Sequence, residues 1–159
     1  KQLRELNWID QCYNIMLSGP TGTGKTYIAA GLGYDAIRKG YKAFFRNMSD
    51  ILATLRLKEL TTSASKEFKR LSEAQLIIID DVMTLPLGRE DGNRFFVFIN
   101  RIYETTSFII TTNKSPAEWA KSLDDETLAT AILDRLLYKC QLIQFHRSSY
   151  RMENRQTIF

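Results

Sequence analysis

The chain has 159 residues, 44% of them hydrophobic and 25% charged, a composition typical of a folded domain with one substantial core. The formal net charge of +4 fits a nucleic-acid partner, although such an excess is also common on proteins that bind none. Cys12 and Cys140 form no CxxC pair, and the chain has one histidine, so we expect two buried free thiols rather than a zinc site or a disulfide framework. No apolar run approaches the roughly 20 residues of a membrane span, and we expect a cytoplasmic protein.

Apolar runs and helical periodicities alternate along the whole chain. Strands are predicted at residues 12–18, 42–46, 76–79, 107–112 and 141–145. Helices are predicted at residues 25–39, 49–60, 63–74, 90–103 and 126–138, with a further helix after Ser115. The alternation predicts an α/β fold of the three-layer α/β/α type, with a mainly parallel five-stranded sheet whose ligands bind beyond the carboxyl ends of the strands.

Several helix boundaries and one helix face have local signals. Gly40 is expected to end the helix at 25–39. Ser115, Pro116 and Glu118 supply an N-cap, a proline at the first helical position and a capping-box glutamate. The expected apolar stripe of the helix at 90–103 consists of Phe95, Ile99 and Ile102.

The glycine-rich run GPTGTGKT satisfies the pattern GxxxxGK[ST] between a predicted strand and a predicted helix. Its glycines let the backbone wrap around phosphate oxygens, and the helix N-terminus adds partial positive charge. Lys25 is expected to reach the β- and γ-phosphates of ATP, and Thr26 to place its hydroxyl on Mg²⁺. The predicted nucleotide-binding residues are Gly19, Pro20, Thr21, Gly22, Thr23, Gly24, Lys25 and Thr26.

Two later strands end in polar residues that suit the same site. Asp80 and Asp81 follow the apolar run LIII, so we expect Asp80 to hold the Mg²⁺ shell and Asp81 to orient or deprotonate the attacking water. Many related enzymes have Glu in place of Asp81, and the shorter side chain favours a slow enzyme or one that needs a partner. Asn113 ends the strand at 107–112, where it is either a turn residue or a hydrogen-bonding group beside Asp81.

These motifs resemble a known family. GPTGTGKT, LIIIDD, LPLGREDGNRFF, TTN, SPAEW, ATAILDRLL and the final SYR cover nearly the whole chain. Together they resemble AAA+ ATPases of the helicase-loader and initiator group, which includes DnaC, and within it the IstB-like helpers of insertion-sequence transposition. The last three motifs carry most of the specificity, since Walker-type motifs occur in many unrelated NTPases.

The resemblance implies an ATPase that assembles as a homo-oligomer on DNA, remodels the DNA and presents it to a transposase. It gives Asn113 the sensor-1 role, Arg135 the role of an arginine finger for a neighbouring subunit, and Arg151 a role in sensing nucleotide. It also implies one AAA+ core over residues 1–159 without a separate lid domain. Because residue 1 is Lys rather than Met, we expect that an amino-terminal segment is missing.

The family likeness places DNA contacts, largely sequence-independent, on the helical insertion at residues 49–74. Its basic residues are Arg56, Lys58, Lys66, Lys69 and Arg70. Acidic residues alternate with them, so an ordinary solvated helix face is the alternative interpretation. Two other functions stay open: a DnaC-like helicase loader that acts as an ATP-dependent binding switch, and a small-molecule kinase, which the extra strand before LIIIDD and the later TTN strand disfavour.

Overall fold

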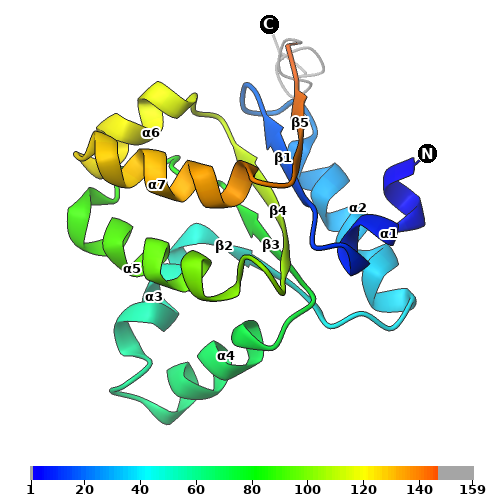
Figure 1. Cartoon of the computed structure of the whole chain (residues 1–159), viewed down its shortest axis with the longest axis horizontal. Helices are drawn as coiled ribbons and strands as arrows, with labels where there is room; N and C mark the ends of the chain where they lie inside the picture. The colour runs from blue at the N-terminus through cyan, green and yellow to red at the C-terminus, as the bar shows by residue number, and fades with distance from the viewer. Residues whose placement is uncertain (1, 147–159) are drawn as a thin grey trace, which may run out of the picture.

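The computed structural model describes residues 2–146 and shows a five-stranded sheet in which all neighbouring strands are parallel (Figure 1). The strands are β1 (Asn14–Ser18), β2 (Ala43–Asn47), β3 (Leu76–Asp80), β4 (Ser107–Thr112) and β5 (Cys140–Gln144). Their order across the sheet is β2-β3-β4-β1-β5, so β4 separates β1 from β3. The predicted parallel α/β sheet is therefore confirmed.

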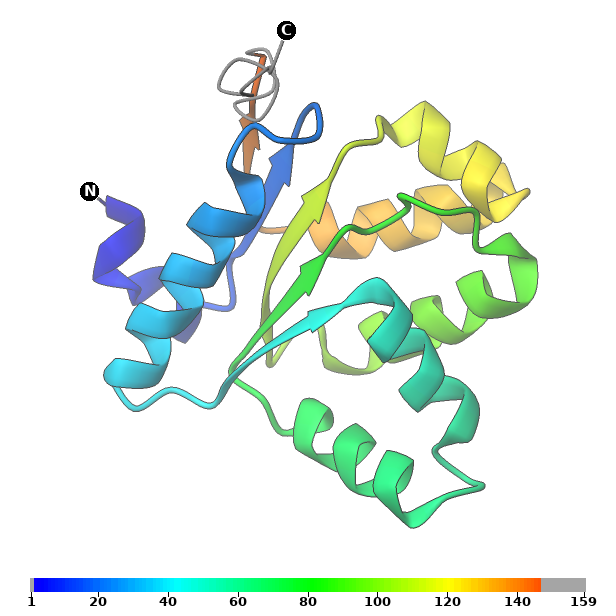
Figure 2. The same cartoon turned by 180° about the vertical axis from the view of Figure 1, so that it is seen from behind.

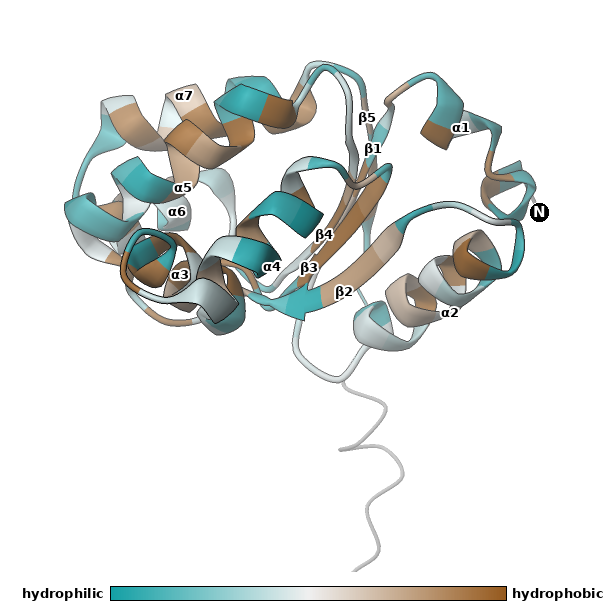
Figure 3. Ribbon diagram, turned by 90° about the horizontal axis from the view of Figure 1, so that it is seen from below, coloured by the Kyte–Doolittle hydropathy of each residue, from teal (hydrophilic) through white to brown (hydrophobic). Residues whose placement is uncertain are grey.

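Helices cover both faces of the sheet (Figures 2 and 3). One layer contains the 3₁₀ helix η1 (Gln2–Glu5), α1 (Asn7–Asp10) and α2 (Lys25–Arg38). The other contains α3 (Met48–Leu57), α4 (Thr62–Ser72), α5 (Gly88–Ile102), α6 (Pro116–Leu123) and α7 (Glu126–Leu137). The three layers are those expected from the alternation of strands and helices.

Each face of the sheet has its own apolar core because successive strand side chains point to opposite faces. In β3, Ile77 and Ile79 pack with α3, α5 and α7, whereas Ile78 packs with α2. All five residues of this strand are buried, as expected for a central parallel strand. The predicted stripe of α5 is also buried: Phe95, Ile99 and Ile102.

The helix boundaries follow the local signals. Gly40 lies just past the C-cap of α2 with φ 91°, and its N–H bonds to the Ile37 carbonyl at 3.0 Å, as in a glycine-terminated helix. Ser115 and Glu118 form the predicted capping box of α6, with Pro116 at its first position. η1 and α1 were not predicted, because four residues are too few to show a helical period.

Cys12 and Cys140 are free, as expected, but both are half-buried rather than buried. Within residues 2–146, no group of three or more His, Cys, Asp or Glu side chains could hold a metal ion. No helix in this part of the chain is long and apolar enough to cross a membrane.

Candidate functional site

The glycine-rich loop joins the end of β1 to the start of α2 and depends on its glycines for shape. Gly22 and Gly24 have φ values of 81° and 93°, in the left-handed region that favours glycine. A Cβ on Gly19 would lie 2.4 Å from the Phe145 carbonyl oxygen at the end of β5. Gly24 is the N-cap of α2 and has no side chain to cap the helix. The first N–H groups of α2 therefore face the loop without a side-chain hydrogen-bond acceptor from the N-cap.

Lys25 begins α2 and turns its ammonium group back into the loop. Its side chain is buried, with the residue 8% exposed, and Nζ donates to the carbonyls of Gly19 at 2.8 Å and Pro20 at 2.7 Å. Burial lowers the pKa of Lys25 below its ordinary value of 10.5, while the nearby carboxylates of Asp81 and Asp80 oppose the shift. A buried cation whose hydrogen bonds within residues 2–146 go to neutral oxygens is a favourable place for an anionic ligand.

Asp80 brings the end of β3 to the start of α2. Its Oδ1 accepts hydrogen bonds from the hydroxyls of Thr26, at 2.9 Å, and of Thr111 on β4. The Thr111 hydroxyl also accepts the backbone N–H of Asp81 at 2.9 Å. Asp81 itself is exposed and has φ 58°, so the chain turns sharply after the strand. Three elements that are distant in sequence therefore meet at the two acids.

Asn113 follows β4 and contacts the glycine-rich loop from the other side. Its Nδ2 donates to the Thr21 hydroxyl at 3.3 Å. Its Oδ1 is buried and has no hydrogen-bond partner among residues 2–146. A buried acceptor of this kind suits a donor on a ligand or on a water beside it. The turn interpretation is therefore incomplete, because the amide also faces the loop that begins α2.

The oxygen groups at the glycine-rich loop suit a nucleotide with bound Mg²⁺. Thr26 and Asp80 place a hydroxyl and a carboxylate in contact, and Mg²⁺ prefers oxygen ligands. Mg²⁺ is usually bound by one or two protein oxygens together with phosphate oxygens and water, so it needs no larger cluster of acids. The buried Lys25 ammonium and the Asn113 acceptor face the same loop, as a phosphate and an attacking water would require.

Arg135 lies away from this group. It is near the end of α7, where the adjacent Leu136 carbonyl accepts a 2.9 Å hydrogen bond from Asn14, the first residue of β1. The glycine-rich loop follows the opposite end of β1, about 16 Å away along five residues of strand. Arg135 thus does not join the site of its own copy. Arg151 lies outside the described residues.

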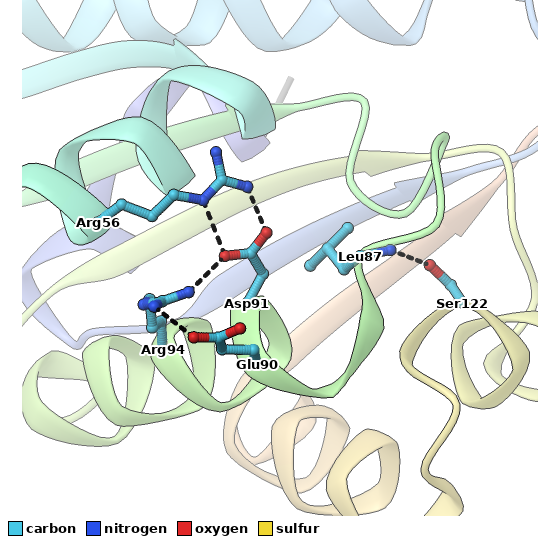
Figure 4. Close-up of polar contacts among 6 residues, drawn as sticks. All are labelled: Arg56, Leu87, Glu90, Asp91, Arg94 and Ser122. Atoms are coloured by element: carbon cyan, nitrogen blue, oxygen red, sulfur yellow. Dashed lines mark hydrogen bonds and ion pairs between the residues drawn. The ribbon is translucent and has the colours of Figure 1, made fainter.

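The basic residues of the insertion differ in how far they are already neutralised. Arg56 forms an ion pair with Asp91 on α5, which also accepts from Arg94 at 2.9 Å (Figure 4). The hydrogen bond from Arg56 is the main reason that the pKa of Asp91 lies below its ordinary value. Arg70 bonds to Glu67 at 2.6 Å. Lys66 and Lys69 are exposed and form no ion pair within residues 2–146.

The family model described as "IstB-like ATP binding protein" matches residues 1–158. The chain belongs to this family. A Bacteroides fragilis protein named for an IS21-like insertion sequence and for ATP binding is 47% identical to the IstB-like chain over 159 residues. A Pseudomonas aeruginosa protein named for IS21 is 35% identical over 156 residues, or 98% of this chain. These matches cover 60% and 59% of the relatives, so the chain spans about three fifths of their length.

Solved structures share the fold of the IstB-like chain at low sequence identity. The DnaC helicase loader matches with a TM-score of 0.73 and 20% identity, over 91% of this chain and 86% of that one. AMPPCP-bound DnaA from Aquifex aeolicus matches with a TM-score of 0.70 and 23% identity, over 91% of this chain and 44% of DnaA. The predicted α/β fold is therefore the fold of these solved structures, and the family and relative names support nucleotide binding.

Sequence reasoning missed two polar residues that contact predicted functional residues. Thr111 was noted only as part of the TTN motif, yet its hydroxyl contacts both Asp80 and Asp81. Asn100, on α5, accepts a 2.9 Å hydrogen bond from Arg135 Nε, and no motif pointed to it. Both interactions join separate elements, so only the packing of those elements could reveal them.

Proposed function

We propose that this IstB-like chain hydrolyses ATP within a homo-oligomer on DNA and so prepares target DNA for a transposase. The observation that carries the proposal is the meeting of Lys25, Thr26 and Asp80 with the amide of Asn113 around one loop. These groups come from three strand ends, as an α/β nucleotide site requires. In this proposal residues 1–159 act as one ATPase core.

Each side chain has a physical task in binding and orienting ATP. The loop N–H groups and Lys25 hold the phosphates, the ammonium exchanging its bonds to Gly19 and Pro20 for phosphate oxygens. Thr26 and Asp80 would hold Mg²⁺, which neutralises charge on the phosphates when bound. Asp81 orients the attacking water and accepts its proton, and Asn113 Oδ1 accepts a hydrogen bond from the same water.

Arg135 completes the site of a neighbouring copy. Its position at the amino end of β1 keeps it from the phosphates bound by its own copy, so a contribution to hydrolysis must be made to another. A guanidinium can offset charge on the transferring phosphoryl group, and supplied in trans it is worth about 10³ to 10⁵ in rate in other NTPases. A head-to-tail assembly follows, because each copy offers a finger at one end and a site at the other.

The DNA partner is proposed from the insertion and from the family. The exposed ammonium groups of Lys66 and Lys69 are available to DNA phosphates, whereas Arg56 and Arg70 are already paired with acids. Lys58 forms no ion pair within residues 2–146, but it is half-buried and lies over the Phe68 ring. One solved neighbour, a DnaA, is bound to AMPPCP and single-stranded DNA. The names of the relatives place them in insertion sequences, which supports a transposase as the protein partner.

The test is ATP hydrolysis at varied protein concentration, with and without double-stranded DNA. We expect the rate per subunit to rise with both, because sites are completed between copies. Asp81→Asn should bind ATP and lose turnover, and Arg135→Ala should bind ATP and lose the concentration-dependent rate. Arg38→Ala, which removes an exposed arginine at the end of α2, is the matched control. A flat, negligible rate with tight ATP binding would contradict the proposal and support the helicase-loader switch.

A further inference from the structure

Arg135 is held by three side chains at the carboxyl-terminal end of α5. Its Nε donates to Asn100 Oδ1 at 2.9 Å. Its guanidinium carbon lies 5.8 Å from the ring centroid of Phe96 and 5.6 Å from that of Tyr103. The three residues are four and three positions apart, so they share one face of the helix and its C-cap. Together they fix both the position and the plane of the guanidinium.

The contacts leave the outer end of the guanidinium available. Asn100 takes the inner nitrogen, Nε, and within residues 2–146 the two terminal nitrogens of Arg135 form no hydrogen bond. Arginine binds a phosphate through paired N–H groups of this kind, with a geometry that depends on the plane of the fork. The amide therefore anchors the side chain without using the donors that an oxyanion needs.

The held arginine lies in the wall of an open hollow of about 500 Å³. Lys139 adds a second positive charge to that wall, opposed by one carboxylate, that of Glu104. Tyr138 beside it is 72% exposed, so this end of α7 presents both cations and apolar surface to the outside. A wall with this net charge favours a polyphosphate carried by another molecule.

We propose that Asn100, with the rings of Phe96 and Tyr103, positions Arg135 so that its terminal nitrogens meet the triphosphate bound by a neighbouring copy. This inference rests on the proposed function, in which Arg135 acts in trans, and adds the group that sets its geometry. In this proposal Asn100 is a positioning residue, because it acts through its hydrogen bond with Arg135. α5 of one copy therefore supports the arginine that contacts the nucleotide of the next copy.

The first experiment compares Asn100→Ala with Asn93→Ala. Asn93 is an exposed asparagine on the same helix, two turns earlier, and forms no hydrogen bond within residues 2–146. We expect Asn100→Ala to bind ATP as wild type does and to hydrolyse it about tenfold to a hundredfold more slowly. A displacement of the guanidinium by about 1 Å is enough to lower the rate of hydrolysis by that factor. Asn93→Ala should keep the wild-type rate.

Mixing variants shows whether Asn100 acts on the neighbour. Lys25→Ala subunits are expected not to bind ATP but carry an intact Arg135 and its support, whereas Asn100→Ala subunits have an intact nucleotide loop. In a random equal mixture, about a quarter of the interfaces pair a sound loop with a sound finger. We therefore expect the mixture to recover about that fraction of the wild-type rate, although each variant alone is slow.

An Asn100→Ala protein with the wild-type rate would overturn the positioning role and leave the proposed function intact. A slow Asn100→Ala protein whose mixture shows no recovery would overturn the action of Arg135 on a neighbouring copy, on which both proposals rest. A wild-type protein without turnover would overturn both. A readout that needs no turnover is the NMR signal of the Arg135 Nε–H. The Nε–H proton should exchange slowly with water in wild type and in Asn93→Ala, and rapidly in Asn100→Ala. Equal exchange rates in all three proteins would show that Asn100 does not hold the guanidinium.

Discussion

The Thr111 hydroxyl forms hydrogen bonds with both acids of the site, so its removal should lower the free energy of unfolding measurably. Thr111 is 1% exposed; it donates to Asp80 Oδ1 and accepts the N–H of Asp81. Thr111→Val keeps the shape and loses both bonds. The bond to a charged carboxylate is worth about 1.5 to 3 kcal/mol, and a buried unpaired N–H costs about 1 to 3 kcal/mol. Because Asp81 is exposed, water recovers part of the second loss, and we expect the free energy of unfolding to fall by about 2 to 4 kcal/mol.

Urea denaturation of Thr111→Val and Thr111→Ser distinguishes the contribution of the hydroxyl to the free energy of unfolding from that of the methyl group. Thr111→Ser keeps the hydroxyl and loses one buried methyl, at a cost of about 1 kcal/mol. The valine variant should therefore be the less stable of the two. It should also need more Mg²⁺ for the same ATP affinity, because Asp80 is held less firmly. A valine variant as stable as the serine variant would refute the reasoning.

Three further predictions test the packing and the titration of particular groups. In Gly31→Ala on α2, the new Cβ meets open space, and the variant should be about 0.5 to 1 kcal/mol more stable than wild type. In Gly33→Ala the new Cβ lies 2.4 Å from Ile78 Cδ1. Thermal unfolding should show this variant to be about 1 to 3 kcal/mol less stable than Gly31→Ala. Burial lowers the pKa of Lys25, so the folded protein binds fewer protons than the unfolded chain between that lowered pKa and 10.5, and stability rises with pH across this window. Phosphate binding favours the charged ammonium, so calorimetry in two buffers should show proton uptake on ATP binding at alkaline pH; its absence would contradict the assignment. Burial raises the pKa of Cys140 to about 11, so with the other cysteine replaced by serine, alkylation at pH 8 should be about a hundredfold slower in the folded than in the urea-unfolded protein.

The elements that local sequence determines could be predicted closely. The strand at 107–112 has the observed bounds, and the branched apolar run LIII gives a strand buried on both faces. The capping box of α6 was predictable because Ser115 and Glu118 bond within a single turn. The glycine-rich loop was predictable for the same reason, since its conformation depends on its own glycines.

The remaining features depend on packing between distant parts of the chain. The predicted helix at 90–103 begins at Gly88 in the structure. The residue before it, Leu87, donates its N–H to the Ser122 carbonyl at 3.1 Å and to Ser122 Oγ at 3.3 Å on α6, a contact with a distant part of the chain (Figure 4). The basic insertion could be located, but pairing of Arg56 with Asp91 joins α3 to α5 and leaves no local signal. A count of basic residues therefore overstates the positive charge that the insertion presents at its surface.

The order of the strands explains why these residues gather where they do. The chain leaves β1 through α2 and reaches the far edge at β2; β3 and β4 then fill the space back towards β1. α2 packs on one face and the helices after β4 pack on the other, so the connections that leave β1 and β4 diverge at the carboxyl ends of these strands. The glycine-rich loop and Asn113 meet there through Thr21, and Thr111 contacts Asp80 on the neighbouring strand. The same parallel arrangement puts the start of β5, and with it Arg135, at the opposite end of the sheet. A fold that gathers three strand ends into one site thus leaves this arginine outside the site of its own copy, which supports the proposed role in a neighbouring one.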